Sequence, residues 1–138
     1  MGERRKSREL ALQMLFQIDL GKVLISEIEK DFLEKIDESK EVKTFALELV
    51  KGTLENLDRI DSLIKERLQN WEFSRIANVD KNILRFATYE LLLREDIPVA
   101  VTINEAIEIA KEYSGKEAGK FINGILDKIK EDKNIKKK

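Results

Sequence analysis

Apolar residues recur at intervals of three and four along nearly the whole chain, which is the spacing that places them on one face of an α-helix. Leu10, Met14 and Ile18 follow this spacing near the N-terminus, and Phe121 and Ile125 follow it near the C-terminus. No segment shows a sustained alternation of apolar and polar residues, and the chain contains a single proline. The sequence therefore predicts an all-α fold of six or seven helices with no sheet.

Short polar motifs indicate where some of these helices begin. Ser26 with Glu29, and Thr102 with Glu105, have the spacing of a capping box, in which the hydroxyl and the carboxylate bond the free N–H groups of a first turn. We therefore expect helices to start at both places. Gly21 is expected to end the first helix, which covers about residues 6–20.

Other boundaries depend on single residues. Gly52 and Asn56 interrupt the apolar spacing after a third helix. The residues that follow are expected to form a fourth helix or a bent continuation of the third. Asn78 is placed to cap a fifth helix, which is apolar on more than one side and is therefore expected to be central. Pro98 disfavours helix in the residue before it, so residues 96–101 are expected to form an extended, partly buried connection.

The 138 residues fit one compact domain with two helical halves. The segment 70–74, with Trp71 and Phe73 as aromatic plugs, is expected to be a loop between an N-terminal half of about residues 4–70 and a C-terminal half of about residues 75–133. No linker rich in glycine, serine or proline separates the halves. We therefore expect two small three-helix bundles that share one core.

The composition excludes most kinds of active site. The chain has no histidine and no cysteine, which removes the usual general base, the cysteine nucleophile and the zinc-thiolate site. Its glycines form neither GxGxxG nor a P-loop. With 27 acidic residues, carboxylates at helical spacing are expected to be solvated faces. These absences predict a protein that is not an enzyme and that holds no metal and no cofactor.

Charge is unevenly distributed although the net charge is only −1. Four cations against one acid give residues 1–8 a charge of +3, six lysines against two acids give residues 128–138 a charge of +4, and the stretch between carries −8. Such a chain has basic ends for a polyanion and an acidic body for a basic protein, although basic tails also serve solubility. No targeting signal and no apolar run of membrane-spanning length is present, so a cytoplasmic protein without a membrane partner is expected.

Two basic segments are candidate anion sites. Arg4, Arg5, Lys6 and Arg8 repel one another at a helix N-terminus, where the helix dipole also disfavours cations, so the arrangement makes sense if an anion binds there. A frayed basic tail is the alternative.

The second segment covers residues 114–124. Its small residues allow close backbone approach, Lys116 and Lys120 suit phosphate, and Phe121 and Asn123 suit a base. Alternatively, Phe121 continues an apolar stripe and belongs to the core.

Several segments resemble the NusB family of transcription antitermination factors. The resemblance covers nearly the whole chain in order and is carried by residues 4–9, 11–16, 79–85, 87–91, 97–98, 103–111 and 120–127. It implies an all-α fold of two three-helix bundles. It also implies binding of boxA RNA in ribosomal RNA transcripts together with the small-subunit ribosomal protein that acts as NusE, and through this complex an indirect association with RNA polymerase and the other Nus factors.

The resemblance also implies positions for the two surfaces. By position, the RNA surface would comprise Arg4, Arg5, Lys6, Arg8, Gln13, Lys116, Glu117, Lys120, Phe121 and Asn123. The surface for the ribosomal protein would include Asp80 and Arg85, and also Phe16, which stands where the family is expected to have a tyrosine.

Two other functions remain open at this point. One is a helical scaffold that binds only proteins, for which the basic ends are incidental. The other is a stand-alone relative of the N-terminal domain of ribosomal RNA methyltransferases, although no catalytic domain or cofactor loop follows in this chain. The sequence also leaves open whether the chain is a monomer or a homodimer.

Overall fold

The computed structural model describes residues 2–21, 24–68 and 72–132, which form seven α-helices and one 3-10 turn and contain no strand. The all-α prediction is therefore confirmed. Trp71, expected in an aromatic loop, lies outside the described residues. In chain order the elements are α1 (Gly2–Asp19), α2 (Ile25–Lys35), α3 (Lys40–Glu55), α4 (Leu57–Arg67), η1 (Phe73–Arg75), α5 (Asn78–Leu93), α6 (Val99–Ser114) and α7 (Lys116–Lys130).

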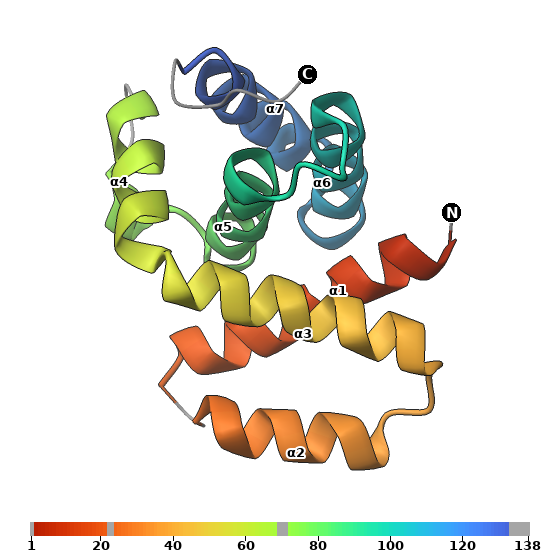
Figure 1. The fold of residues 1–138 in the computed structure, drawn as a ribbon. Helices are drawn as coiled ribbons and strands as arrows, with labels where there is room; N and C mark the ends of the chain where they lie inside the picture. The colour runs from red at the N-terminus through yellow and green to blue at the C-terminus, as the bar shows by residue number, and fades with distance from the viewer. Residues whose placement is uncertain (1, 22–23, 69–71, 133–138) are drawn as a thin grey trace.

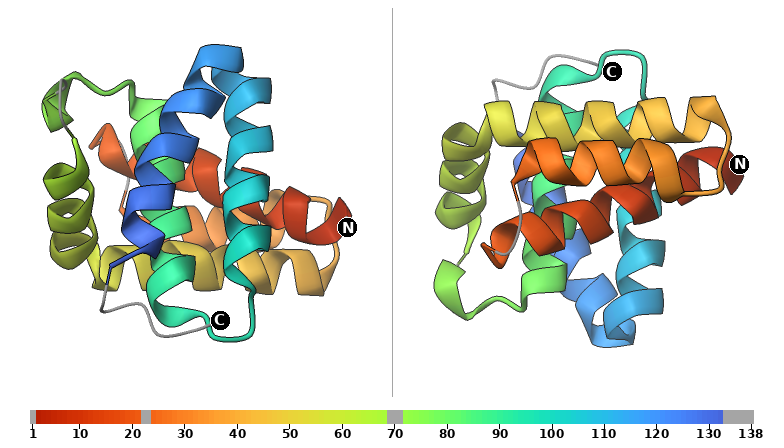
Figure 2. Two further views of the ribbon diagram at one scale, coloured as in Figure 1. Left: turned by 90° about the horizontal axis from the view of Figure 1, so that it is seen from above. Right: turned by 90° about the horizontal axis from the view of Figure 1, so that it is seen from below.

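The helices form two groups that share one core (Figure 1). In the first group α1 packs along α3, and α2 lies on their outer side (Figure 2). In the second group α6 and α7 form an antiparallel pair that packs on α5, while α4 lies against α5 and α7. α5 also packs on α1 and α3, so it joins the two groups.

The central place of α5 follows from its sequence. Ile83, Leu84 and Phe86 are all fully buried, although residues this close together in a helix point to different sides of it. A helix that is apolar on more than one side can lower its free energy only by packing on several neighbours. The expected central helix is thus confirmed, and Leu93, its last residue, is the only α5 residue that is classed as exposed and not as buried or partly buried.

The two predicted capping boxes are wrong. α6 begins at Val99, directly after Pro98, because the fixed φ of proline suits the residue before a first helical turn. Thr102 and Glu105 therefore lie inside the helix, and their side chains contact other helices. Ser26 similarly lies inside α2, and it is Glu27 that accepts a hydrogen bond from the N–H of Leu24, at 3.0 Å.

Other helix ends also differ from expectation. Gly21, with a φ of 73°, follows the end of α1 as expected. Gly52 does not interrupt α3, because the ring of Tyr89 packs directly on it. The break comes at Asn56, whose amide donates to the carbonyl of Gly52 at 2.8 Å. Asn78 is the first residue of α5 and bonds Asn82 instead of capping the helix.

Gly52→Ala is expected to destabilise the protein, because the new Cβ would lie 2.2 Å from the Tyr89 ring and would force the ring off α3. The expected loss in the free energy of unfolding is roughly 1–3 kcal/mol. Gly124→Ala is the matched control, since Gly124 is also inside a helix but has nothing within 4 Å of such a Cβ. This control should gain roughly 0.5–1 kcal/mol through helix propensity. Urea unfolding of both variants measures the difference, and equal stabilities would contradict the contact.

Candidate nucleic-acid interface

The four cations near the start of α1 do not form one open patch, because Arg8 is buried. Its side chain is turned into the core, where Nε and Nη2 donate to the two carboxylate oxygens of Glu90 on α5 at 2.7 and 3.0 Å. The hydroxyl of Thr102 on α6 donates to the same carboxylate at 2.6 Å. Arg8 was expected at the RNA surface, but with 2% exposure it instead ties α1 to α5 and α6.

Arg5 lies at the border between core and surface. Its Nε and Nη2 donate to both carboxylate oxygens of Glu105 on α6, at 2.5 and 2.9 Å. The hydrogen bonds from Arg5 lower the pKa of the Glu105 carboxyl against the opposing effect of burial. About a third of the Arg5 side chain stays exposed, so this cation is held in place and partly neutralised without being removed from the surface.

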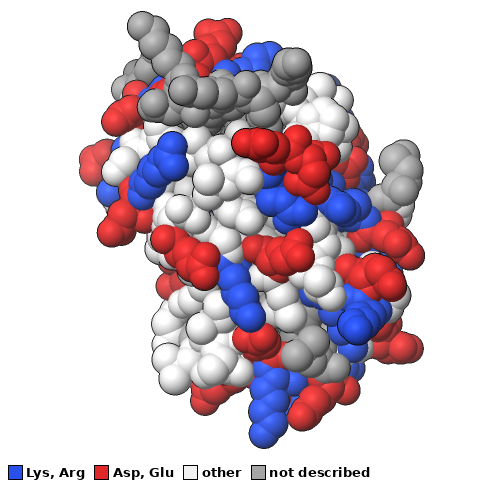
Figure 3. Space-filling model, in the orientation of Figure 1, with Lys and Arg blue, Asp and Glu red and all other residues white. Residues whose placement is uncertain are grey.

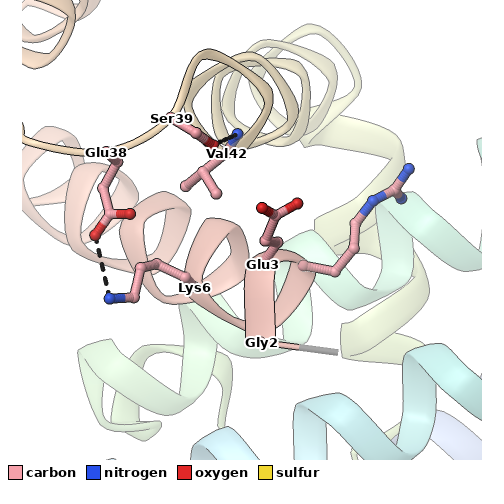
Figure 4. Close-up of a pocket in the computed structure, with 7 residues that line it drawn as sticks. Gly2, Glu3, Lys6, Glu38, Ser39 and Val42 are labelled. Carbon is pink, nitrogen blue, oxygen red and sulfur yellow. Dashed lines mark hydrogen bonds and ion pairs between the residues drawn. The ribbon is translucent and has the colours of Figure 1, made fainter.

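Arg4 and Lys6 are the exposed cations of this segment. They line an open groove between the start of α1 and the residues around the start of α3, across which Lys6 reaches Glu38 at 3.1 Å (Figure 4). The guanidinium of Arg4 lies 3.8 Å from the ring centroid of Phe45. Such a cation–π contact orients Arg4, and the charge of Arg4 also helps to lower the pKa of Asp96, after the hydrogen bonds from Arg94.

The second basic segment begins where Gly115, with a φ of 101°, turns the chain from α6 into α7. The expected contact residues Lys116, Glu117 and Lys120 are exposed. The amine of Lys120 lies 3.7 Å from the carboxylate of Glu117. At this helix N-terminus, free backbone N–H groups add to the lysine charges.

The small residues and the ring of this segment have structural functions as well. Gly119 is buried, and a Cβ there would lie 2.8 Å from the side chain of Lys111, so its close approach is to α6. Phe121 is partly buried and packs against the core, which agrees with the alternative that its apolar spacing suggested. Asn123, two residues further along α7, is exposed.

Gln13 connects the two basic segments. It is exposed on α1, and its Nε2 lies 3.5 Å from the hydroxyl of Tyr113 in the last turn of α6. Sequence reasoning missed Tyr113, which is 40% exposed. Tyr113 follows Ala110 by three residues, so its spacing predicts that it lies on the apolar face of α6. The only sign that it could be exposed was its place directly before Ser114 and Gly115, where the helix ends.

Acidic side chains accompany the same contact between α1 and α6. Burial raises the pKa of Glu9 on α1, and the negative charge of Glu112 on α6 raises it further. Glu105 contributes in the same direction, while Arg5 and Lys6 oppose it. The region between the two basic segments is therefore acidic, and anions are favoured at its two ends only.

The residues expected to contact a protein partner lie around the end of α1 and the start of α5. Arg85 is buried, and its Nε and Nη2 donate to Asp61 of α4, both at 2.9 Å, while its Nη1 lies 3.2 Å from Asp19 of α1. Burial alone would raise the pKa of Asp19, but Arg85 and Lys81 bring it below its ordinary value. Arg85 therefore fastens three helices together and presents little surface.

Asp80 and Phe16 are more accessible than Arg85 because both are only partly buried. One carboxylate oxygen of Asp80, Oδ1, is buried and has no hydrogen-bond donor among the residues that the structure describes. A buried acceptor without a donor is costly, and a donor from a bound partner would remove that cost.

Two further findings concern metal binding and membrane spanning. Within residues 2–21, 24–68 and 72–132, no group of three or more acidic, histidine or cysteine side chains is arranged to hold a metal ion. None of the helices in that part of the chain is long and apolar enough to cross a membrane.

Comparison with known sequences gives one family across almost the whole chain. The model of the NusB family matches residues 5–131. The chain is 46% identical to the transcription antitermination protein NusB of Thermodesulfovibrio yellowstonii over 137 residues, which cover 92% of this chain and 91% of that protein. It is also 46% identical to the NusB protein of Bacillus subtilis strain 168 over 130 residues, covering 94% and 96% of the two chains.

Solved structures give the same result. The fold is similar to that of T. maritima NusB with a TM-score of 0.82 and 44% identity, covering 94% of this chain and 91% of that one. It is also similar to a chain in the crystal structure of the antitermination factors NusB and NusE in complex with dsRNA. There the TM-score is 0.83 at 27% identity, and 94% of this chain and 97% of the other are covered.

Glu90→Gln is expected to destabilise the protein by about 3–5 kcal/mol, because it leaves the buried Arg8 charge without its carboxylate partner. Glu29→Gln makes the same chemical change in the exposed pair between Glu29 and Lys51, and should cost less than about 1 kcal/mol. Urea unfolding of the two variants beside the unsubstituted protein measures both values. A similar small loss for both would mean that the Arg8–Glu90 pair does not hold the helices together.

Proposed function

This chain belongs to the NusB family, and from that membership we propose that it is a transcription antitermination factor. It binds boxA RNA of ribosomal RNA transcripts together with the small-subunit ribosomal protein that acts as NusE. Through this complex it associates indirectly with RNA polymerase and the other Nus factors. The observation that carries the proposal is the match, over nearly the full length of both chains, to a protein found in a complex of NusB and NusE with dsRNA.

The arrangement of the cations supports RNA binding at the contact between α1 and α6–α7. Arg4 and Lys6 are exposed at one end of this region, and Lys116 and Lys120 are exposed at the other. Phosphate binding by such cations supplies most of the salt-dependent affinity for single-stranded RNA. Arg5 and Gln13 lie between these ends, while the interior Arg8 positions the helix that carries them.

The remaining residues of the proposed RNA surface fit a supporting function. Asn123 is exposed on α7 and can hydrogen-bond a base edge. Phe121 is partly buried against the core, so only part of this side chain is available to the RNA. Glu117 shares the first turn of α7 with Lys116 and lowers the net charge there.

The surface for the ribosomal protein lies where α1 ends and α5 begins. Phe16 provides an apolar contact, and Asp80 provides a buried carboxylate oxygen that a donor of the partner can bond. Arg85 fixes the positions of α1, α5 and α4 relative to one another. An acidic body suits a basic ribosomal protein, because complementary charge speeds association. On the face of the molecule seen in Figure 3, acidic and basic side chains are interspersed.

This function requires neither catalysis nor a cofactor, and it takes place in the cytoplasm, where the transcripts are made. An acidic protein with small basic sites binds RNA weakly by itself, so the basic partner is expected to strengthen binding by adding phosphate contacts. The methyltransferase alternative loses support because the curated relatives matched over nearly their whole length are NusB proteins.

Fluorescence anisotropy with labelled boxA RNA and a scrambled RNA of equal length tests the proposal. The protein should prefer boxA, and the preference should strengthen when the NusE partner is added. Equal weak binding of both RNAs, with and without the partner, would contradict the proposed function and favour a scaffold that binds only proteins.

The double substitution of Arg4 and Lys6 by alanine is expected to weaken boxA binding and to reduce the salt dependence. Each phosphate contact on a single strand adds about 0.7 to the slope of log K against log salt concentration, so the slope should fall by roughly 1.4. Lys30→Ala on α2 serves as the control, because Lys30 is exposed on the helix farthest from α6 and α7. An unchanged slope in the double variant would remove this end of α1 from the RNA surface.

A further inference from the structure

The exposed aromatic ring of Tyr113 is not explained by the fold. The described residues include five large apolar side chains that are exposed, Leu20, Leu24, Leu93, Val101 and Tyr113, and only the last of these is aromatic. A single exposed aliphatic side chain is common in proteins and indicates nothing. An exposed aromatic ring beside candidate phosphate-binding residues is different, because every nucleic-acid base has a face that can stack on it.

Tyr113 lies between the two basic ends of the proposed RNA surface. Its hydroxyl lies 3.5 Å from Nε2 of Gln13, which places the ring against α1. Gln13 follows Arg5 by eight residues, or about 12 Å along the helix axis. In the other direction, Lys116 follows Tyr113 by three residues, across the turn at Gly115.

The charges next to Tyr113 disfavour a phosphate group at this position. Glu112 directly precedes it, and Glu9 of α1 is close enough to Glu112 for the two carboxylates to interact. A phosphate here would face two negative charges, whereas an uncharged base would not. RNA that crosses from α1 to α7 is therefore expected to keep its phosphates on the cations at both ends and to turn a base towards the protein between them.

Phe121 is less suited to stacking than Tyr113. Phe121 is partly buried and packs against the core, whereas the residue Tyr113 is 40% exposed. Gln13 provides an amide beside the Tyr113 ring, and an amide has both a donor and an acceptor for a base edge. Tyr113 therefore combines an accessible ring with an adjacent group that can hydrogen-bond a stacked base.

We propose that Tyr113 is the platform on which one unpaired base of the bound RNA stacks, with the Gln13 amide beside it to contact the base edge. This inference rests on the proposed function and extends it by naming a residue that contacts a base. The interaction requires single-stranded RNA, because a base in a duplex is covered by its neighbours.

The test uses three variants at one position and a control on the same helix. Tyr113→Ala removes the ring, Tyr113→Leu keeps apolar bulk without an aromatic face, and Tyr113→Phe keeps the face without the hydroxyl. Val101→Ala is the control, because Val101 is 43% exposed on the first turn of α6. Far-UV circular dichroism and the thermal midpoint confirm that each variant is folded, and the Leu variant guards against a fold defect in the Ala variant.

Affinity for boxA RNA is expected to fall roughly fivefold or more in the Ala and Leu variants, which is the range for loss of one stacked base. The Phe variant and Val101→Ala should stay within about twofold of the unsubstituted protein. The salt slope should stay unchanged, because no phosphate contact is lost. A Leu variant that binds boxA as tightly as the unsubstituted protein, or one whose affinity falls together with the salt slope, would overturn the proposal.

A second measurement reports stacking directly. RNA with the fluorescent base 2-aminopurine placed at successive positions should be quenched at one position by the unsubstituted protein and by the Phe variant, but not by the Leu variant. Equal quenching by the Leu variant at every position would also overturn the proposal.

The two proposals fail in different ways. If the proposed function is wrong, the unsubstituted protein binds boxA and scrambled RNA equally, whatever residue stands at position 113. If only the stacking proposal is wrong, the unsubstituted protein still prefers boxA and the Leu variant keeps that preference and that affinity.

Discussion

The buried pair between Arg8 and Glu90 is the interaction on which the arrangement of the helices depends. Both side chains lie in the interior, Glu90 accepts from Arg8 and from Thr102, and the three residues come from α1, α5 and α6. A buried charge is tolerated only when its partner and its hydrogen bonds are all in place, so the pair permits one relative position of these helices. That position brings the start of α1 next to α6 and thereby brings Arg5 to Glu105.

The pairing of charged side chains also explains the uneven distribution of charge on the proposed RNA surface. Arg5 is held by a carboxylate and Arg4 by an aromatic ring, and Lys6 reaches Glu38. These three cations repel one another less in the free protein than three unpaired cations would. They also lose less side-chain entropy when RNA binds. The acids between the two basic ends disfavour phosphate there, which is why Gln13 and Tyr113 are the contacts that we propose between those ends.

The sequence was sufficient for the type and approximate extent of most helices, because apolar spacing depends only on which face is buried. It was insufficient for Arg8, since a cation in a basic run looks the same whether it meets solvent or a buried carboxylate 82 residues away. It was also insufficient for Thr102 and Glu105. These two residues have the spacing of a capping box, but in the structure Thr102 bonds Glu90 of α5 and Glu105 bonds Arg5 of α1. Tyr113 was missed for a related reason, because helical spacing does not say which residue in a last turn stays exposed.

The sequence by itself determined that the chain is helical, that it lacks the histidine and cysteine chemistry of many enzymes, and that its motifs are those of the NusB family. These properties follow from residue types and local spacing, which need no knowledge of distant contacts. Only the tertiary structure decided which cations of the basic segment face solvent and that Tyr113 stands between the two basic ends. Burial and ion pairing are set by residues far apart in the chain, and these come together only when α1, α5 and α6 pack.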